Sequence, residues 1–204
     1  MAKNRRNEAE EQPPTALPNR RDVLGVGGGL LIGAALTAPS GASAAKPPEK
    51  MVAQPGDRIQ IIKGALKDQM VRPELLEAGA KPFEAFPFDP ENGVLRRKYR
   101  LNRMLVLRLD PAEMDDATRE LSADGVLVFS ALCTHRACTI KSWKAEERQL
   151  RCHCHLSEFA ALAGGSVTDG PARRRLPMVP LGLDDEGFIV AKESFNGKVG
   201  AAKK

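Results

Sequence analysis

The sequence predicts a mostly β domain with one short helix. Apolar and mixed residues alternate at 58–63 and 104–109, a pattern typical of half-buried strands. A Val-Leu-Val-Phe-Ser run at 126–130 indicates a short buried strand, and an Asp-Asp-Glu-Gly turn at 184–187 separates two further apolar runs. Together these patterns favour antiparallel strands joined by turns.

The remaining elements follow along the chain. The expected strands are 58–63, 104–109, 126–130, 149–151, 176–183 and 188–191, the last two forming a hairpin. One helix is expected over 112–121, with Asp110 as its N-cap and Pro111 at its first position. Residues 64–100 are rich in proline with scattered aromatics, so we expect an irregular insertion that wraps the β base or docks a partner.

Size and charge limit the functional classes. The chain has 204 residues and a formal net charge of +5. Residues 1–45 carry five Lys/Arg and four Asp/Glu, which leaves +4 on the remaining 159 residues. A part of that size is expected to be one domain. Its mildly basic balance gives no reason to expect a nucleic acid partner. The chain has two basic runs, at 96–103 and at 173–175. We expect the first to be a solvated face.

Residues 1–45 have the pattern of an export signal. Arg20 and Arg21 precede an uncharged stretch whose apolar part is diluted by five glycines, and Ala42-Ser43-Ala44 then offers a small-x-small cleavage site. The paired arginines resemble a twin-arginine signal, a route for folded, cofactor-loaded proteins. The alternative is a retained membrane anchor, although the apolar run is short against the roughly 20 residues that a spanning helix needs.

Every cysteine and histidine of the chain lies between 133 and 155, in two short boxes. Box 1, residues 133–138, reads Cys-Thr-His-Arg-Ala-Cys, and box 2, residues 152–157, reads Cys-His-Cys-His-Leu-Ser. Each box offers a thiolate and an imidazole at close spacing, and an extra cysteine. If both cysteines bind one iron and both histidines the other, the result is a [2Fe–2S] cluster of mixed ligation. The alternative is tetrahedral zinc, but the Cys-x-x-Cys pairs usual in structural zinc sites are absent.

These boxes resemble those of Rieske iron–sulfur proteins, in the subtype with an extra cysteine in each loop. The stretch Gly170-Pro171-Ala172 resembles the proline-containing third loop of that family, and the likeness spans roughly 126–192. The resemblance implies a Rieske-like antiparallel β-sandwich base with a small cluster-binding subdomain. It places the Rieske domain at 46–193, its cluster-binding part at about 131–172, and a flexible basic tail at 194–204.

The resemblance also assigns the site residues. It implies one Rieske-type [2Fe–2S] cluster whose irons are bound by Cys133 with Cys152 and by His135 with His155. It further implies a disulfide between Cys138 and Cys154 that clamps the two loops together. His153 is then a spectator. Residues expected to tune the cluster are Ser157, Phe159, Gly170 and Pro171.

Two functional classes remain open. A ring-hydroxylating oxygenase needs a second iron held by two histidines and a carboxylate, and only His153 would be left for it. An electron carrier or complex subunit without a catalytic site of its own is therefore expected. In the first class it serves a periplasmic oxidoreductase as a small subunit or carrier; in the second it is the Rieske subunit of a quinol:cytochrome c reductase.

The residues between the ligands favour the first class. Quinol-oxidising Rieske proteins typically have Leu, Gly and Gly where this chain has Arg136, Ala137 and Leu156. Burying a guanidinium against an apolar quinone site is costly, whereas a basic face suits an acidic protein surface. We expect Arg136, with Arg173, Arg174 and Arg175, to dock the partner. The alternative for Arg136 is that it points into water.

Cluster potential and location follow from the same comparison. Phe159 stands where high-potential members have a tyrosine that donates to a cysteine sulfur, so a lower potential is expected. The expected partner is a redox protein, either a dehydrogenase subunit or a cytochrome, with a quinol as the alternative. The expected location is the bacterial periplasm or the periplasmic face of the inner membrane. Membrane contact is expected only through an uncleaved N-terminal segment.

Overall fold

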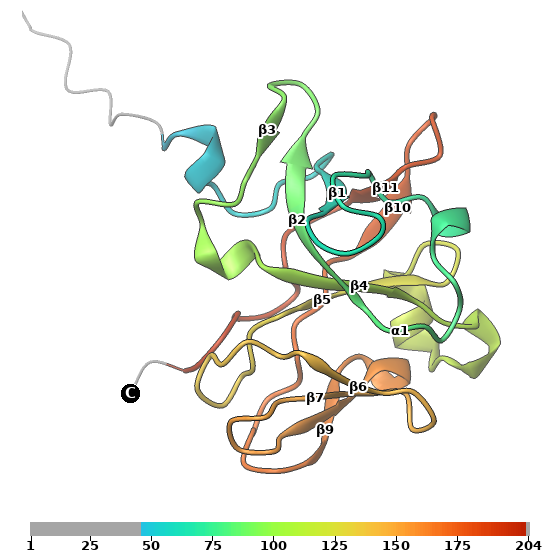
Figure 1. Ribbon diagram of the computed structural model, residues 1–204, viewed down its shortest axis with the longest axis vertical. Helices are drawn as coiled ribbons and strands as arrows, with labels where there is room; N and C mark the ends of the chain where they lie inside the picture. Colours follow the sequence, from blue (N-terminus) through green and yellow to red (C-terminus); the bar gives the residue numbers. More distant parts are fainter. Residues whose placement is uncertain (1–45, 203–204) are drawn as a thin grey trace, which may run out of the picture. The chain divides into compact units, whose positions relative to one another are not determined.

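The computed structural model describes residues 46–202, which form two antiparallel sheets (Figure 1). The larger sheet runs in the order β10–β11–β1–β2–β4–β5, and β3 pairs with β2. Its strands are β1 (Arg58–Ile61), β2 (Phe83–Asp89), β3 (Val94–Leu95), β4 (Met104–Arg108), β5 (Val126–Ser130), β10 (Leu181–Leu183) and β11 (Ile189–Ala191). The smaller sheet contains β6 (Ser142–Lys144), β7 (Gln149–Arg151), β8 (Glu158–Ala160) and β9 (Ser166–Asp169). The predicted export signal over 1–45 lies outside the described residues.

The mostly β prediction is confirmed. Strands stand at 58–61, 104–108, 126–130, 149–151 and 189–191, close to the expected positions. β10 and β11 form the predicted hairpin, with Leu183 opposite Ile189. Of the smaller sheet, only β7 was predicted. β6, β8 and β9 were missed because they are only three or four residues long, which is too short for a recognisable alternation. Within residues 46–202, no helix is long and apolar enough to cross a membrane.

The strand expected over 176–183 is divided in two. The Val179 N–H donates to the Val128 carbonyl at 2.9 Å and the Ser130 N–H to the Pro177 carbonyl at 2.8 Å, so this part pairs with β5. After Pro180 the chain changes partner and continues as β10, which pairs with β11. The bend brings the two ends of the larger sheet together, because β5 and β10 are its outermost strands.

The expected helix is also divided in two. Asp110 caps a single 3-10 turn, Pro111–Glu113, by accepting from the Ala112 N–H at 2.9 Å. The α-helix α1, Asp116–Leu121, begins again with Asp115 as its cap. The Asp115 carboxylate accepts from the Thr118 N–H at 2.7 Å, and the Asp115 N–H donates to the Leu162 carbonyl instead of to the preceding turn. A tertiary contact therefore interrupts the helix.

The expected irregular insertion over 64–100 contains a central strand instead. β2 pairs with β1 on one side and with β4 and β3 on the other. Pro87 hides this strand in the sequence, because proline cannot donate to a ladder. Its carbonyl accepts from the Arg96 N–H at 2.9 Å. Pro87 has no N–H to donate, and this gap lies on the side of β2 that faces β3 and β4. It falls between the residues that pair with β4 and those that pair with β3.

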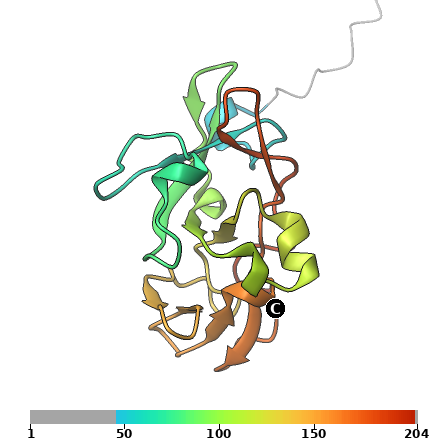
Figure 2. The same ribbon diagram turned by 90° about the vertical axis from the view of Figure 1, so that its right-hand side faces the viewer.

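β4 and β5 separate two apolar cores, and Figures 1 and 2 show them between the smaller sheet and the rest of the larger one. Met104, Val106, Val126 and Val128 face the core of β1, β10 and β11. The alternate residues face the other way, into the core that holds the smaller sheet and the cysteine boxes: Leu105, Leu107, Leu127 and Phe129. Both faces of these strands are thus buried, and box 1 begins three residues beyond β5.

Arg96 is buried, contrary to the expectation of a solvated basic face. Its side chain is 5% exposed, and its Nε donates to both Asp57 carboxylate oxygens at 2.8 and 3.0 Å. Nη2 donates to Asp89 at 2.9 Å and Nη1 to the Pro48 carbonyl at 2.8 Å. The other members of the run fit the expectation better, since Arg97, Lys98 and Arg100 are exposed and Arg103 is half-buried. Arg96 therefore ties the segment that enters the domain to β2 and β3.

Replacing Arg96 with methionine is expected to lower the free energy of unfolding by about 3–5 kcal/mol, because it leaves two carboxylates buried without a cation. Urea unfolding followed by circular dichroism measures this loss. The matched control is Arg97→Met, an exposed neighbour, for which a change within about 0.5 kcal/mol is expected. Equal stability of the two variants would contradict the assigned role of Arg96.

Candidate metal centre

Three loops meet at the end of the domain that holds the smaller sheet. Box 1 connects β5 to β6, and box 2 connects β7 to β8. The third loop, the proline loop (residues 170–175), follows β9. Each box leaves the end of a strand, as expected from the apolar runs that precede it.

Each box is closed by its own backbone. In box 1 the Cys133 N–H donates to the Cys138 carbonyl at 2.9 Å, and the Ala137 N–H donates to the Cys133 carbonyl at 2.8 Å. In box 2 the Cys152 N–H donates to the Ser157 carbonyl at 2.9 Å. Ala137 and Leu156 have positive φ angles of 57° and 60°. These are the positions where the family pattern has glycine, the residue that adopts this conformation without strain.

Cys133 and Cys152 are free thiols, 1% and 2% exposed, and face each other inside the domain. Burial raises the pKa of the Cys133 thiol. The backbone N–H groups of His135 and Arg136 point toward the same sulfur and act in the opposite direction, while the neighbouring Cys152 raises the pKa further. Two thiols thus lie side by side with backbone donors already directed at one of them.

Cys138 and Cys154 form the predicted disulfide, which is confirmed. It joins the two boxes across 16 residues of sequence, with the Cα atoms 6.5 Å apart. The Sγ atoms of Cys138, Cys152 and Cys154 all lie within 4.8 Å of one another. This triplet is not itself a metal site, because two of its sulfurs are consumed by the bond. It shows instead that the clamp lies directly against one of the free thiols.

His135 and His155 lie together on the outer side. Their ring centroids are 4.6 Å apart, with the planes nearly perpendicular. Nδ1 of His135 is buried and has no hydrogen-bond partner among residues 46–202. Burial lowers the pKa of His135, and the neighbouring His155 and Arg136 lower it further. A buried imidazole nitrogen without a partner is a ligand atom that a metal would satisfy.

The donor set fits a [2Fe–2S] cluster. Two buried thiols and two adjacent imidazoles match the division of ligands in which two histidines replace two cysteines on one iron. The same four groups are also a legitimate tetrahedral set for zinc. The chemistry of these four groups is therefore compatible with both iron and zinc, and the comparison with known proteins decides between them.

A model of the Rieske [2Fe-2S] domain matches residues 93–180. A Haloferax mediterranei protein, described as the Rieske subunit of a respiratory nitrate reductase, is 31% identical over 186 residues. That match covers 89% of this chain and 80% of the relative. The chain belongs to the Rieske [2Fe–2S] family. The zinc alternative is thereby excluded in favour of one [2Fe–2S] cluster.

Other relatives share only part of their length with this Rieske protein. A cytochrome bc1 complex Rieske iron-sulfur subunit of Streptomyces lividans is 34% identical over 100 residues, 48% of this chain and 59% of the relative. The chain thus spans less than two thirds of that subunit. Among solved structures, the soluble domain of Rieske protein II from Sulfolobus acidocaldarius matches with a TM-score of 0.39 and 20% identity, over 74% of this chain and 81% of that one.

The remaining roles of the box residues stay predictions. Cys133, His135, Cys152 and His155 lie where the Rieske pattern requires ligands, and their assignment to the two irons stays a prediction. The His153 side chain is exposed at the outer edge of box 2, a position that fits the spectator role expected for it.

The proline loop packs directly on box 2. A Cβ on Gly170, whose φ is +81°, would lie 2.6 Å from the Cα of Ser157 and 2.8 Å from the Leu156 carbonyl oxygen. The Ala172 N–H donates to the Ser157 Oγ at 3.1 Å. This leaves the hydroxyl proton of Ser157 available to a second acceptor, in keeping with the tuning role predicted for it. Pro171 is exposed at the tip of the loop.

Phe159 is fully buried in β8, opposite Leu150 of β7 and Val167 of β9. It belongs to the same apolar core as Cys133 and Cys152. The position predicted for cluster tuning is therefore inside the protein and shielded from water, where a hydroxyl would have to find a protein or cluster acceptor.

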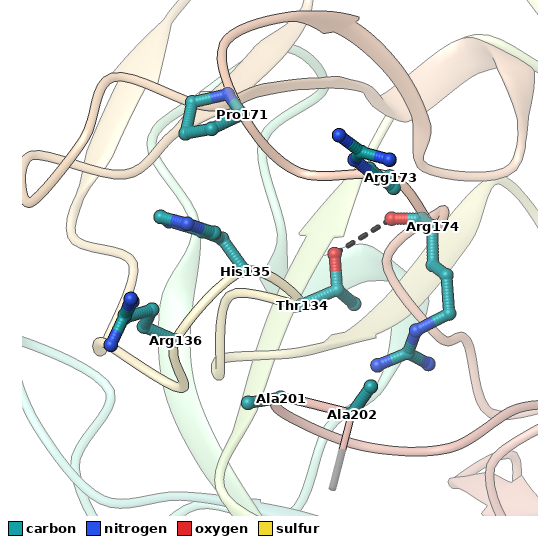
Figure 3. A pocket seen from close by; sticks show the side chains of 8 residues that line it. All are labelled: Thr134, His135, Arg136, Pro171, Arg173, Arg174, Ala201 and Ala202. Carbon is teal, nitrogen blue, oxygen red and sulfur yellow. Dashed lines mark hydrogen bonds between the residues drawn. The ribbon is translucent and has the colours of Figure 1, made fainter. Parts of the chain in front are cut away.

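A pocket of about 690 Å³ opens beside His135 (Figure 3). Its lining residues are Thr134, His135, Arg136, Pro171, Arg173, Arg174, Ala201 and Ala202. Arg136 and Arg173 are exposed at this pocket, and Arg174 is half-buried. Arg175 lies elsewhere, with its guanidinium against Gly164 and near Asp115. The structure thus brings three of the four predicted docking arginines together.

Sequence reasoning missed the C-terminal residues of this pocket. The tail expected to be flexible is held from 196 onward: the Asn196 N–H donates to the Met178 carbonyl and its Oδ1 accepts from the Met178 N–H, at 2.8 and 2.9 Å. Ala201 and Ala202 then line the pocket. Small and basic residues at a chain end resemble a frayed tail, so the sequence carries no local signal of this docking.

Gly170→Ala is expected to lower the free energy of unfolding of the cluster-loaded protein by about 2–5 kcal/mol. The new methyl group combines backbone strain at positive φ with overlap against box 2. The control is Gly93→Ala, also at positive φ but with nothing within 4 Å of the added carbon, for which about 1–2 kcal/mol is expected. Urea unfolding and iron content would be measured for both, and equal losses would contradict the packing role of Gly170.

Proposed function

We propose that this Rieske protein transfers electrons outside the cytoplasm, as a small subunit or carrier that serves a periplasmic oxidoreductase. The observation that carries the proposal is the asymmetry of the centre. The two free thiols are buried, whereas the two imidazoles meet near the surface beside a basic pocket. Electrons would enter and leave at the imidazole side.

Cys133 and Cys152 would hold one iron and His135 and His155 the other. When bound, the cluster supplies a one-electron redox couple. The chain's own residues supply the surroundings: the disulfide holds the boxes together, the proline loop covers box 2, and the apolar core around Phe159 excludes water. In this proposed role, chemistry on a substrate would belong to a partner.

An acidic redox protein is the partner that fits the exposed charges. Arg136 and Arg173 are exposed next to His135. Basic groups around an electron exit attract an acidic surface over a distance and raise the rate of encounter. A dehydrogenase subunit or a cytochrome with an acidic docking patch meets this requirement.

The proposed location rests on two features. The segment 1–45 has the composition of a cleavable twin-arginine signal or an anchor. The Cys138–Cys154 bond belongs to an oxidising compartment. In the proposed organisation, residues 46–193 form the Rieske domain, with residues 131–172 as its cluster-binding part, and membrane attachment, where it occurs, uses the N-terminal segment.

A quinol:cytochrome c reductase subunit is the second candidate. The relative from Streptomyces lividans belongs to a bc1 complex, and Leu156 is 49% exposed immediately after His155. An exposed apolar side chain at this tip would suit a quinone site. Against this stands Arg136, whose charge would have to enter the same apolar surroundings.

The function is tested by oxidising the reduced, cluster-loaded protein with two small oxidants of opposite charge. Ferricyanide is an anion and tris(phenanthroline)cobalt(III) is a cation. We expect salt to slow the reaction with ferricyanide and not the reaction with the cobalt complex, because the basic face attracts only the anion. Arg136→Ala should reduce the ferricyanide rate about two- to fivefold at low salt, and Arg97→Ala should leave it unchanged.

Other outcomes identify the alternatives. Equal salt dependence with both oxidants, together with an unchanged rate for Arg136→Ala, would show that the basic face plays no part. Rapid reduction of the oxidised protein within a membrane fraction by a short-chain ubiquinol would favour the quinol reductase role.

Phe159→Tyr is expected to raise the midpoint potential. A hydroxyl that donates to a sulfur of the cluster favours the reduced form by about 1 kcal/mol, or about 40 mV for one electron. Phe86→Tyr, in β2 of the larger sheet, is the control and should leave the potential unchanged. A redox titration that finds the same midpoint in Phe159→Tyr and wild type would refute the tuning role.

A further inference from the structure

The last described residues of the chain line two hollows. The pocket of about 690 Å³ beside His135 has Ala201 and Ala202 on one side, opposite Pro171 and Arg173 (Figure 3). A second hollow of about 330 Å³ is lined by Asn196, Gly197 and Lys198 of the same segment, together with Arg174, Arg175 and Pro177. Residues 196–202, the C-terminal segment, thus line parts of both hollows, and Ala201 and Ala202 form a wall of the first.

Arg174 holds this wall in place. Its Nη1 donates to the Lys198 carbonyl at 2.9 Å and its Nη2 to the Gly200 carbonyl at 2.6 Å. The two donors of one rigid guanidinium thus reach two carbonyls of the segment. Backbone groups of the tail are bound by a side chain that belongs to the proline loop.

The wall is also tied to box 1. The Thr134 hydroxyl donates to the Arg174 carbonyl at 2.7 Å, so the residue between Cys133 and His135 bonds the same residue that holds the tail. Gly200 is buried, and a Cβ there would lie 3.2 Å from the Ala137 Cβ. The chain end, the proline loop and box 1 are connected in one arrangement around the pocket.

The charge of the pocket has one sign. Arg136, Arg173 and Arg174 line it, and no carboxylate does among the described residues. Ala201 and Ala202 contribute methyl groups, which form a wall of low polarity. A cleft lined by charges of one sign, with walls of low dielectric, concentrates the field inside it and raises the local concentration of counter-ions.

We propose that the C-terminal segment is a built wall of a carboxylate-accepting pocket, and that the occupant is an acidic loop of the protein redox partner. The proposal rests on the proposed function and adds to it the recess that receives the partner and the residue that shapes it. Arg174 acts here as a positioning residue: it holds the wall, while Arg136 and Arg173 meet the carboxylates.

The test uses the cluster-loaded full chain and a polyglutamate peptide as the probe. Binding is measured by calorimetry, and the ratio of the ferricyanide and cobalt oxidation rates is measured alongside. Arg174→Lys keeps the charge but replaces the two-donor fork with a single ammonium group. We expect it to bind the peptide about two- to fivefold more weakly and to lower the rate ratio. The midpoint potential should not change.

Arg97→Lys is the control, because it makes the same change at an exposed arginine that lines neither hollow, and it should bind like wild type. Gly200→Val provides a second variant without a change in charge. Its side chain at positive φ would press against Ala137 and displace the wall, so weaker peptide binding is again expected.

Three results would overturn the proposal. If Arg174→Lys and Gly200→Val both bind the peptide like wild type while Arg136→Ala binds it more weakly, the wall has no role but the basic docking face stands. If citrate binds as tightly as the peptide and competes with it, the occupant is a small anion. If Arg136→Ala also binds like wild type, the docking function itself fails.

Discussion

The cluster-binding end of this domain depends on one covalent constraint, the Cys138–Cys154 bond between the two boxes. Each box is an irregular loop with a few backbone hydrogen bonds of its own, and ordering such loops costs about 1–2 kcal/mol of entropy per residue. A cross-link between them removes much of this freedom from the unfolded chain. The proline loop completes the enclosure, because Gly170 lies so close to box 2 that no side chain fits between them.

The strands supply the rigidity that the loops lack. β4 and β5 are buried on both faces, with one set of alternate residues in each core, so the strand that leads into box 1 cannot tilt without disturbing both. Box 2 sits on the β7–β8 hairpin, whose residues Leu150 and Phe159 pack into the same core as the free thiols. Rigid strands therefore position ligand groups that irregular backbone could not position alone.

Local patterns of sequence led to the family, whereas contacts between residues far apart in the chain were not predicted. The spacing of cysteines and histidines is short-range information; it carried the resemblance to the family, and the resemblance in turn implied the disulfide. β2 was missed because Pro87 breaks its pattern. In the sheet, the neighbouring strands β3 and β4 leave a gap where the N–H of Pro87 is missing. The burial of Arg96 depends on Asp57, 39 residues away, and the order of the tail depends on Arg174, at least 24 residues away. A short window of sequence carries no information about partners that are so far apart in the chain.

The closeness of the Cys138–Cys154 bond to a free thiol bears on the order in which oxidation and metal binding can occur. The Cys152 sulfur lies within 4.8 Å of both sulfurs of the disulfide, and a thiolate attacks a disulfide by direct contact. As long as Cys152 is unoccupied, the four cysteines can exchange partners within one 23-residue window. Binding of metal by Cys152, the role proposed for it, would remove the attacking group. A chain that receives its metal before oxidation has a single way left to pair its cysteines, whereas one that is oxidised first has three.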